Sequence, residues 1–140
     1  MQLSANCKVI HVLNAVAAGT SDQTGAEIDM QGWEGVCFIA DIGALNATQQ
    51  TALQAIGSNA SGAEAEFNTN AQTPFMADGD GNKVLVLDVF QPVTRYVKPV
   101  VIRGTANAVI NCVIAILYRG HKKPLVEDAT VSQLAAFVSP

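Results

Sequence analysis

The chain has 140 residues, about the length of one domain, and 49% of them are hydrophobic, 14% charged and 6% aromatic. A formal net charge of −4 argues against nucleic-acid binding, and no apolar run approaches the roughly 18 to 20 residues that cross a bilayer. So few charged residues are unusual for a free monomer, and we therefore expect extensive contact with other protein chains.

The N-terminal third predicts three strands separated by turns. Residues 8–16 are rich in Val, Ile and Leu, which favours a strand, although their spacing also fits a helix. Residues 26–30 alternate between apolar and polar, as in a half-buried strand. Residues 36–42 are almost wholly apolar and predict a short central strand.

The middle of the chain is harder to interpret. Residues 44–56 fit either a helix or a strand, and we predict a strand with Thr51, Leu53 and Ala55 on one face. Residues 57–73, rich in Gly, Ser, Asn and Ala, predict a long surface loop. Residues 84–89 alternate again and predict a strand that Pro92 ends.

The two longest apolar runs lie in residues 94–118. Gly104 and Asn107 separate two Val- and Ile-rich arms, a pattern that predicts a hairpin at the centre of the core. The period of two places Ile110, Cys112, Ile114 and Ile116 on one face of the second arm. Because both faces are mainly apolar, this arm should lie in a sandwich or under a partner. We predict an all-β fold, an antiparallel β-sandwich of the jellyroll type, over residues 1–126.

Residues 127–140 form a predicted C-terminal tail, either extended or a short helix that Thr130 and Gln133 would cap. The tail is too short to be stable alone, so we expect it to grip a neighbouring subunit. A basic segment before it would steer that contact. The candidate contact residues are Arg119, Lys122, Lys123, Val131, Leu134, Phe137 and Val138.

The first arm of the predicted hairpin carries Arg95, Tyr96 and Lys98, which are candidates for self-association into a homodimer. Arg103 on the same arm could attract an acidic surface. Lys98 stands directly before Pro99, which is typical of a protected edge strand or a bulge, because Pro removes a hydrogen-bond donor.

No pattern in the sequence predicts catalysis, a cofactor, a metal site or a small-molecule substrate. Asp78, Asp80 and Asn82 begin like a calcium-binding loop, but Lys83 replaces its Gly and Val89 its bidentate Glu, so we expect a turn.

The two histidines and three cysteines give no stronger indication. His11 and His121 lie far apart in sequence, without the spacing of a catalytic triad. Cys7, Cys37 and Cys112 lack Cys-x-x-Cys spacing, and we expect them to be small core residues in a reducing compartment.

Four segments together resemble a known family. They read Gly-Trp-Glu-Gly at 32–35, Asn-Lys-Val-Leu-Val-Leu-Asp at 82–88, Pro-x-x-Arg-Tyr-Val at 92–97 and Arg-Gly-Thr-Ala-Asn-Ala-Val-Ile at 103–110. This order resembles the small jellyroll cement (decoration) proteins of short-tailed bacteriophage heads, over most of residues 25–125.

The resemblance implies a structural protein made in the host cytoplasm and bound to the outside of an icosahedral capsid in the virion. Its partner would be the major capsid protein. A phage tail or head-completion protein is the alternative, distinguished by a lower copy number. A cupin-like enzyme comes third, since it would need a cluster of His and Glu on adjacent strands.

Overall fold

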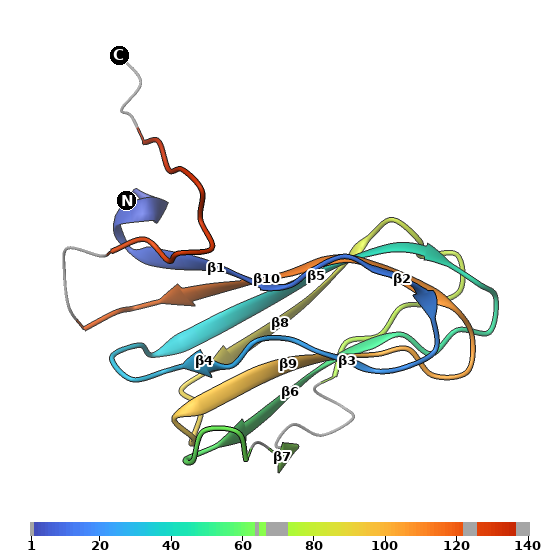
Figure 1. Ribbon diagram of the computed structural model, residues 1–140, viewed down its shortest axis with the longest axis horizontal. Helices are drawn as coiled ribbons and strands as arrows, with labels where there is room; N and C mark the ends of the chain where they lie inside the picture. Colours follow the sequence, from blue (N-terminus) through green and yellow to red (C-terminus); the bar gives the residue numbers. More distant parts are fainter. Residues whose placement is uncertain (1, 64, 67–72, 122–125, 137–140) are drawn as a thin grey trace.

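A computed structural model describes residues 2–63, 65–66, 73–121 and 126–136 of the chain as two antiparallel β-sheets packed face to face (Figure 1). A short 3₁₀ helix, η1 (Leu3–Ala5), precedes the strands. Sheet A contains β1 (Cys7–Leu13), β2 (Val16–Gly19), β5 (Gly35–Leu45), β8 (Val84–Phe90) and β10 (Ala108–Tyr118). Sheet B contains β3 (Gln23–Thr24), β4 (Ile28–Asp29), β6 (Ala52–Ser58), β7 (Ala65–Glu66) and β9 (Tyr96–Ile102).

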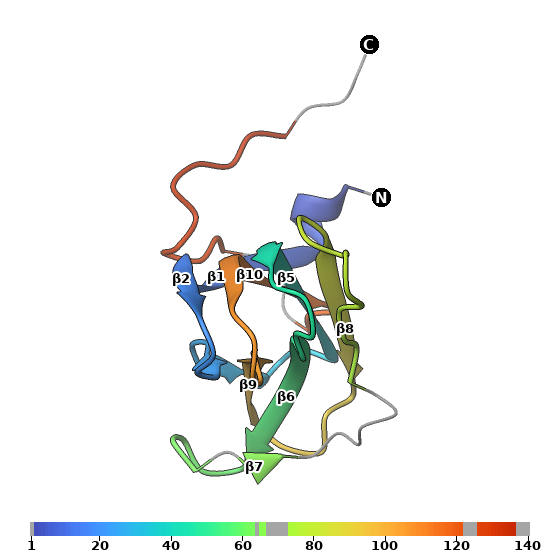
Figure 2. The same cartoon turned by 90° about the vertical axis from the view of Figure 1, so that its right-hand side faces the viewer.

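The strand order is that of a jellyroll. Sheet A runs β1-β10-β5-β8 and sheet B runs β3-β9-β6-β7. Strand β2 also pairs with β10, and β4 also pairs with β9, so each sheet has four strand positions. Most connections cross from one sheet to the other (Figure 2), which gives the double-sheet arrangement of this fold. The predicted all-β antiparallel sandwich is confirmed.

Most of the predicted strands are present. Residues 8–16 become β1 and the start of β2, 36–42 lie in β5, and 84–89 lie in β8. The strand predicted over residues 44–56 is confirmed only for 52–56, which lie in β6; residues 44–45 end β5, and 46–51 connect the two strands without helix.

Two predicted segments are only partly as expected. In the 26–30 strand only Ile28 and Asp29 pair with β9, while Ala26 is exposed. The predicted 57–73 loop begins later, because β6 continues to Ser58, and it contains the short strand β7. Residues 64 and 67–72 of that loop lie outside the described residues.

The predicted hairpin of residues 94–118 is wrong. Strand β9 pairs with β6, β3 and β4, whereas β10 pairs with β1, β2 and β5 in the other sheet. The connection at residues 103–107 is an arch between the sheets. Gly104 has a φ of 67° and would bring an added Cβ to 2.6 Å from Cβ of Gln50, so the turn needs glycine here.

The arch is held from inside by Arg103, whose side chain is only 3% exposed. Its guanidinium donates hydrogen bonds to the carbonyl oxygens of Ser21 (2.6 Å), Ala17 (2.7 Å) and Ala108 (3.0 Å). The expected availability of Arg103 to an acidic partner is therefore wrong, since its donors serve the fold.

A β-bulge in β10 changes the predicted faces of this strand. Its register with β5 shifts between Ile110 and Cys112. Ile110 is therefore fully buried on the core side with Val113 and Ala115, whereas Cys112 and Ile114 lie on the opposite face. The strict period of two predicted for Ile110 fails at this point.

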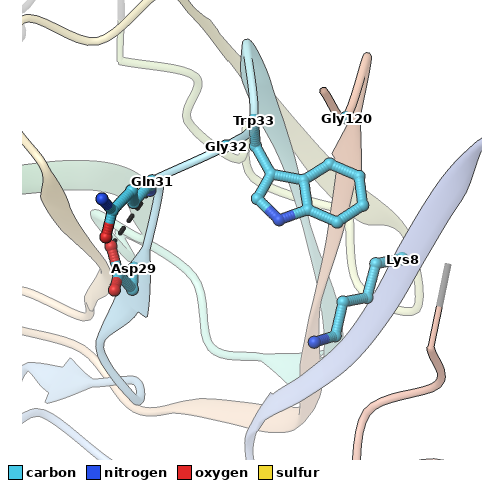
Figure 3. Close-up of a pocket in the computed structure, with 6 residues that line it drawn as sticks. All are labelled: Lys8, Asp29, Gln31, Gly32, Trp33 and Gly120. Carbon is cyan, nitrogen blue, oxygen red and sulfur yellow. Dashed lines mark hydrogen bonds between the residues drawn. The ribbon is translucent and has the colours of Figure 1, made fainter. Parts of the chain in front are cut away.

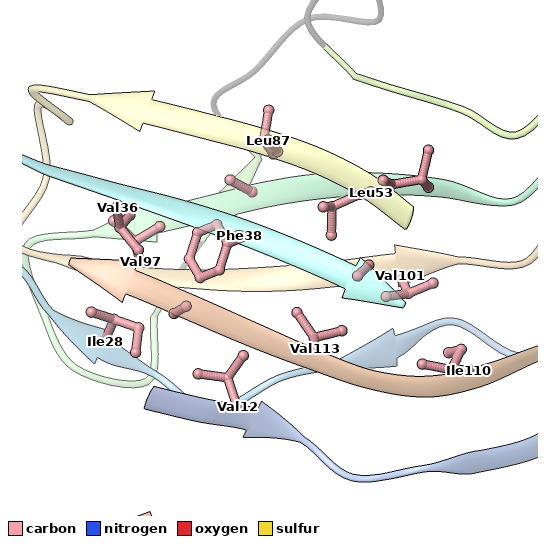
Figure 4. Close-up of a cluster of buried hydrophobic side chains, with 14 of the residues drawn as sticks. Val12, Ile28, Val36, Phe38, Leu53, Leu87, Val97, Val101, Ile110 and Val113 are labelled. Atoms are coloured by element: carbon pink, nitrogen blue, oxygen red, sulfur yellow. The ribbon is translucent and has the colours of Figure 1, made fainter. Parts of the chain in front are cut away.

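The hydrophobic core fills the space between the sheets. Val36, Phe38 and Val113 of sheet A meet Leu53 and Val97 of sheet B there (Figure 4), and all five are fully buried.

Among the described residues no helix is long and apolar enough to span a membrane.

Candidate interaction surface

Sheet A has a second face, which points away from the core and which we call the outer face. Buried and less buried residues alternate along its strands, and the apolar residues of this face are not part of the core cluster. The outer face consists of Cys7, Val9, His11, Cys37, Ile39, Asp41, Val84, Val86, Asp88, Phe90, Cys112, Ile114, Ile116 and Tyr118.

The strand register makes the apolar part of this face continuous. One row across the sheet contains His11, Ile114, Ile39 and Val86, and the row beside it begins with Val9 and continues through Ile116 and Cys37. Side chains directly opposite on adjacent antiparallel strands lie about 4.5–5.5 Å apart at Cβ. Isoleucine and valine therefore cover the middle of the face.

The apolar side chains on β8 are the most exposed. Val84, Val86 and Phe90 are 53%, 51% and 51% exposed, and Val9 on β1 is 38% exposed. Four strands and about six residues of each give a flat area of roughly 400 Å², from strand spacing and rise. This area includes the polar members of the face, and the apolar patch lies within it; the largest apolar patch on a protein surface is often functional.

The two carboxylates of the outer face each accept a hydrogen bond from a side chain of β10. The Tyr118 hydroxyl donates a hydrogen bond of 2.5 Å to Asp88, and the Asn111 amide donates one of 3.3 Å to Asp41. Burial and the bond to Asp88 raise the pKa of Tyr118 above its usual value, so its phenol stays protonated and keeps donating.

The cysteines lie half-buried on this face, which corrects the expectation that they belong to the core. Burial raises the pKa of the Cys37 thiol, and Asp88 adds to the effect. Burial likewise raises the pKa of the Cys112 thiol, with a smaller contribution from Asp41. These two thiols are thus poor nucleophiles at neutral pH.

The sequence-predicted contact residue Arg119 lies at one corner of the outer face. Its guanidinium forms an ion pair of 2.9 Å with Glu34 and lies 5.8 Å from the centre of the Phe90 ring. The Phe90 ring is stacked with that of Tyr118, at 6.4 Å between centroids. Because 66% of the Arg119 side chain is exposed, the cation remains accessible to a partner.

The described part of the tail, residues 127–136, has a turn at 129–130 and no helix; its start lies beside β1, and the chain then leads away from the sheets (Figure 1). The backbone N–H of His11 donates to the Thr130 hydroxyl at 3.0 Å, and Lys8 lies 3.7 Å from Asp128. The start of the tail is thus attached to the edge of its own domain, outside the core.

The tail also extends the apolar surface beyond β1. Val131 and Leu134 border a hollow together with Leu3, Cys7 and Val9, and Leu134 is still 40% exposed. The structure therefore brings these two predicted contact residues next to the outer face. The remaining candidates, Lys122, Lys123, Phe137 and Val138, lie outside the described residues.

The predicted self-association residues lie elsewhere, on sheet B. Arg95 donates two hydrogen bonds to Asp29, of 3.0 and 2.9 Å, and its guanidinium lies 5.0 Å from the centre of the Tyr96 ring. These bonds lower the pKa of Asp29. Arg95 already has a charged partner within the chain, and the structure does not bring this group together with the tail.

Strand β9 is not the edge strand that Lys98 and Pro99 suggested. It lies between β6 on one side and β3 and β4 on the other. Strand β3 pairs with Val100 and Val101, and β4 with Tyr96 and Val97, so the missing donor of Pro99 falls at the break between them.

Sequence reasoning missed the contribution of β8 to the outer face. The signal was present, because Val84 and Val86 alternate with the buried Leu85 and Leu87, leaving the strand apolar on both faces.

Among the described residues, no group of three or more His, Cys, Asp or Glu side chains could hold a metal ion.

Comparisons of the sequence with protein-family models and with curated proteins found no match.

Proposed function

We propose that this protein is a capsid cement protein, which binds the outside of an icosahedral phage head and stabilises contacts between major capsid subunits. The observation that carries the proposal is the outer face, a continuous apolar sheet surface with Val84, Val86 and Phe90 about half exposed. A protein partner would remove this surface from water, at a gain of roughly 25 cal/mol per Å² of apolar area.

The position of the tail supports the same mode of binding. Val131 and Leu134 adjoin the outer face at β1, and Arg119 lies at a corner of that face. A single capsid surface could therefore contact the sheet, the tail and the basic corner together. The resemblance of most of residues 25–125 to jellyroll cement proteins implies that the partner is the major capsid protein.

The test compares two valine substitutions. Val86→Lys places an ammonium group in the outer face, whereas the control Val93→Lys changes a valine that is 89% exposed in the loop after β8. Docking would bury the remaining half of Val86, worth about 1 kcal/mol, and desolvating a lysine adds a further cost, so we expect binding at least about 30-fold weaker.

Both variants would be added to purified phage heads from which the protein has been removed, and bound protein would be measured after sedimentation. Electron microscopy of the decorated heads would give the position and copy number, which separate a cement protein from a head-completion protein. Equal binding by Val86→Lys and Val93→Lys, with both proteins folded, would remove the outer face as the contact surface.

A further inference from the structure

A pocket of about 510 Å³ opens at the end of the sandwich, where β1 and the end of β10 face β4 across the two sheets. Its volume is within the range of about 300–1,000 Å³ that is usual for small-molecule sites. Figure 3 shows Trp33 and Lys8 on one side of the open space and Asp29 and Gln31 on the other. The lining residues are Lys8, Asp29, Gln31, Gly32, Trp33 and Gly120.

The pocket is held by hydrogen bonds to Asp29 on one side and by the packing of Trp33 against Gly120 on the other. Asp29 accepts hydrogen bonds from the backbone N–H of Gln31 (3.0 Å) and from two nitrogens of Arg95. The indole of Trp33 lies against Gly120, where an added Cβ would be 2.9 Å from the ring. A site held in this way loses little conformational freedom when a ligand binds.

The charged groups of the pocket already have partners. Asp29 is paired with Arg95 at 2.9 Å, and Lys8 lies 3.7 Å from Asp128. An ionic ligand would compete with one of these pairs. A neutral ligand would not compete, and it could still donate to the Asp29 carboxylate and accept from the N–H groups of Lys8.

The chemistry that remains is a flat aromatic surface surrounded by donors and acceptors. Trp33 offers an indole N–H and an apolar ring, Gln31 an amide that both donates and accepts, Lys8 donors and Asp29 an acceptor. A sugar ring has the complementary form, with C–H groups on its faces and hydroxyls at its edge. We propose that this pocket binds a neutral pyranose unit of a glycan.

A second hollow, of about 310 Å³, continues the site past Trp33. It shares Gln31 and Trp33 with the first pocket and is bordered further on by Gln91, Pro92 and Thr94. A glycan chain can therefore contact both hollows across the same indole. Oligosaccharides should bind more tightly than single sugars.

The test uses the full-length protein and the fluorescence of Trp33, the one tryptophan of the chain. Glucose, galactose, mannose, N-acetylglucosamine and a trisaccharide of each are titrated separately. We expect a saturable change with at least one sugar series and a trisaccharide affinity several-fold above that of its monosaccharide. Saturation-transfer NMR on the same ligand provides a readout that does not depend on tryptophan emission.

Two pocket variants and a control locate the site. Gln31→Ala and Lys8→Met should each weaken binding at least fivefold, whereas Lys83→Met, which changes an exposed cation outside the pocket, should not. Unfolding curves of all three confirm that they are folded. No saturable signal with any of the eight sugars, or equal affinity in the pocket and control variants, would overturn the proposal.

This inference is independent of capsid binding. Val86→Lys changes the outer face and none of the pocket residues, so it should retain the sugar affinity of the parent protein. Competition of acetate or phosphate with the sugars at equal or lower concentration would indicate an anion site and would also overturn the proposal.

Discussion

Replacement of Arg103 by Met should strongly destabilise the fold while preserving the apolar stem of the side chain. The guanidinium is buried and donates to the carbonyl oxygens of Ala17 in β2, Ser21 in the following connection and Ala108 at the start of β10. These hydrogen bonds join three separate segments at the arch between the sheets. Met leaves all three carbonyl groups without this donor.

The size of the effect follows from those three bonds. Hydrogen bonds to a charged group contribute about 1.5–3 kcal/mol each, but Met also avoids the cost of burying a cation, which offsets part of the loss. We therefore expect a decrease of about 3–5 kcal/mol in the free energy of unfolding, comparable to the loss of one partner of a buried charged pair. Domains of this size are commonly stable by only about 5–15 kcal/mol, so the variant would be close to unfolding.

Equilibrium urea unfolding, followed by Trp33 fluorescence and far-UV circular dichroism, measures the change. Arg119→Met is the matched control, because it removes an exposed arginine with one ion pair and should cost less than about 1 kcal/mol. Arg103→Lys keeps the charge but not the fork of donors, and should be intermediate. If Arg103→Met were as stable as Arg119→Met, the buried guanidinium would not be holding the arch together.

Three further predictions concern the outer face and the tail. In a Tyr96→Phe variant, absorbance titration should show Tyr118 ionising well above the usual phenol value of about 10. Because its pKa is raised on folding, its stabilising contribution is full below about pH 10 and is lost as pH rises through the folded value; a midpoint near 10 would contradict this. Deleting residues 127–140 should cost about 1 kcal/mol of stability or less, since the described contacts to β1 are a hydrogen bond and a partly exposed ion pair, but should weaken head binding; an unfolded or fully binding truncation refutes it. With Cys7 replaced by Ser, the thiols of Cys37 and Cys112 should react slowly with maleimide at pH 7.5. They should react more slowly still on decorated heads, and an unchanged rate there would show that the outer face stays exposed.

Local patterns were sufficient for the strands but not for their pairing. The alternation around Leu85 and Leu87 and the apolar run at 36–42 report burial directly, and both strands are present. The turn at Gly104 reports only that the chain changes direction, and an arch between sheets satisfies it as well as a hairpin does. The sheet to which each strand belongs depends on contacts such as those of Arg103, between residues far apart in sequence.

The candidate sites were predictable only in part, for the same reason. Apolar residues on both faces of β10 indicated that something covers its second side, but the strands that complete the outer face follow from sheet order. The pocket combines Lys8 and Gly120 with Asp29 and Trp33, and no spacing in the sequence connects these positions. The bulge after Ile110 likewise depends on pairing with β5.

The distribution of charge supports the proposal that a partner contacts the outer side of sheet A. The outer face contains no lysine or arginine, and its carboxylates, Asp41 and Asp88, accept hydrogen bonds from neighbours on β10. Strand β8 ends sheet A among the described strands, yet Val84–Phe90 has none of the lysines or prolines that commonly protect an edge from pairing with other chains. Depletion of charge and internal satisfaction of polar groups are properties of the core of a protein interface. The outer face is thus poor in charged side chains, and it is the surface on which the proposed capsid contact depends.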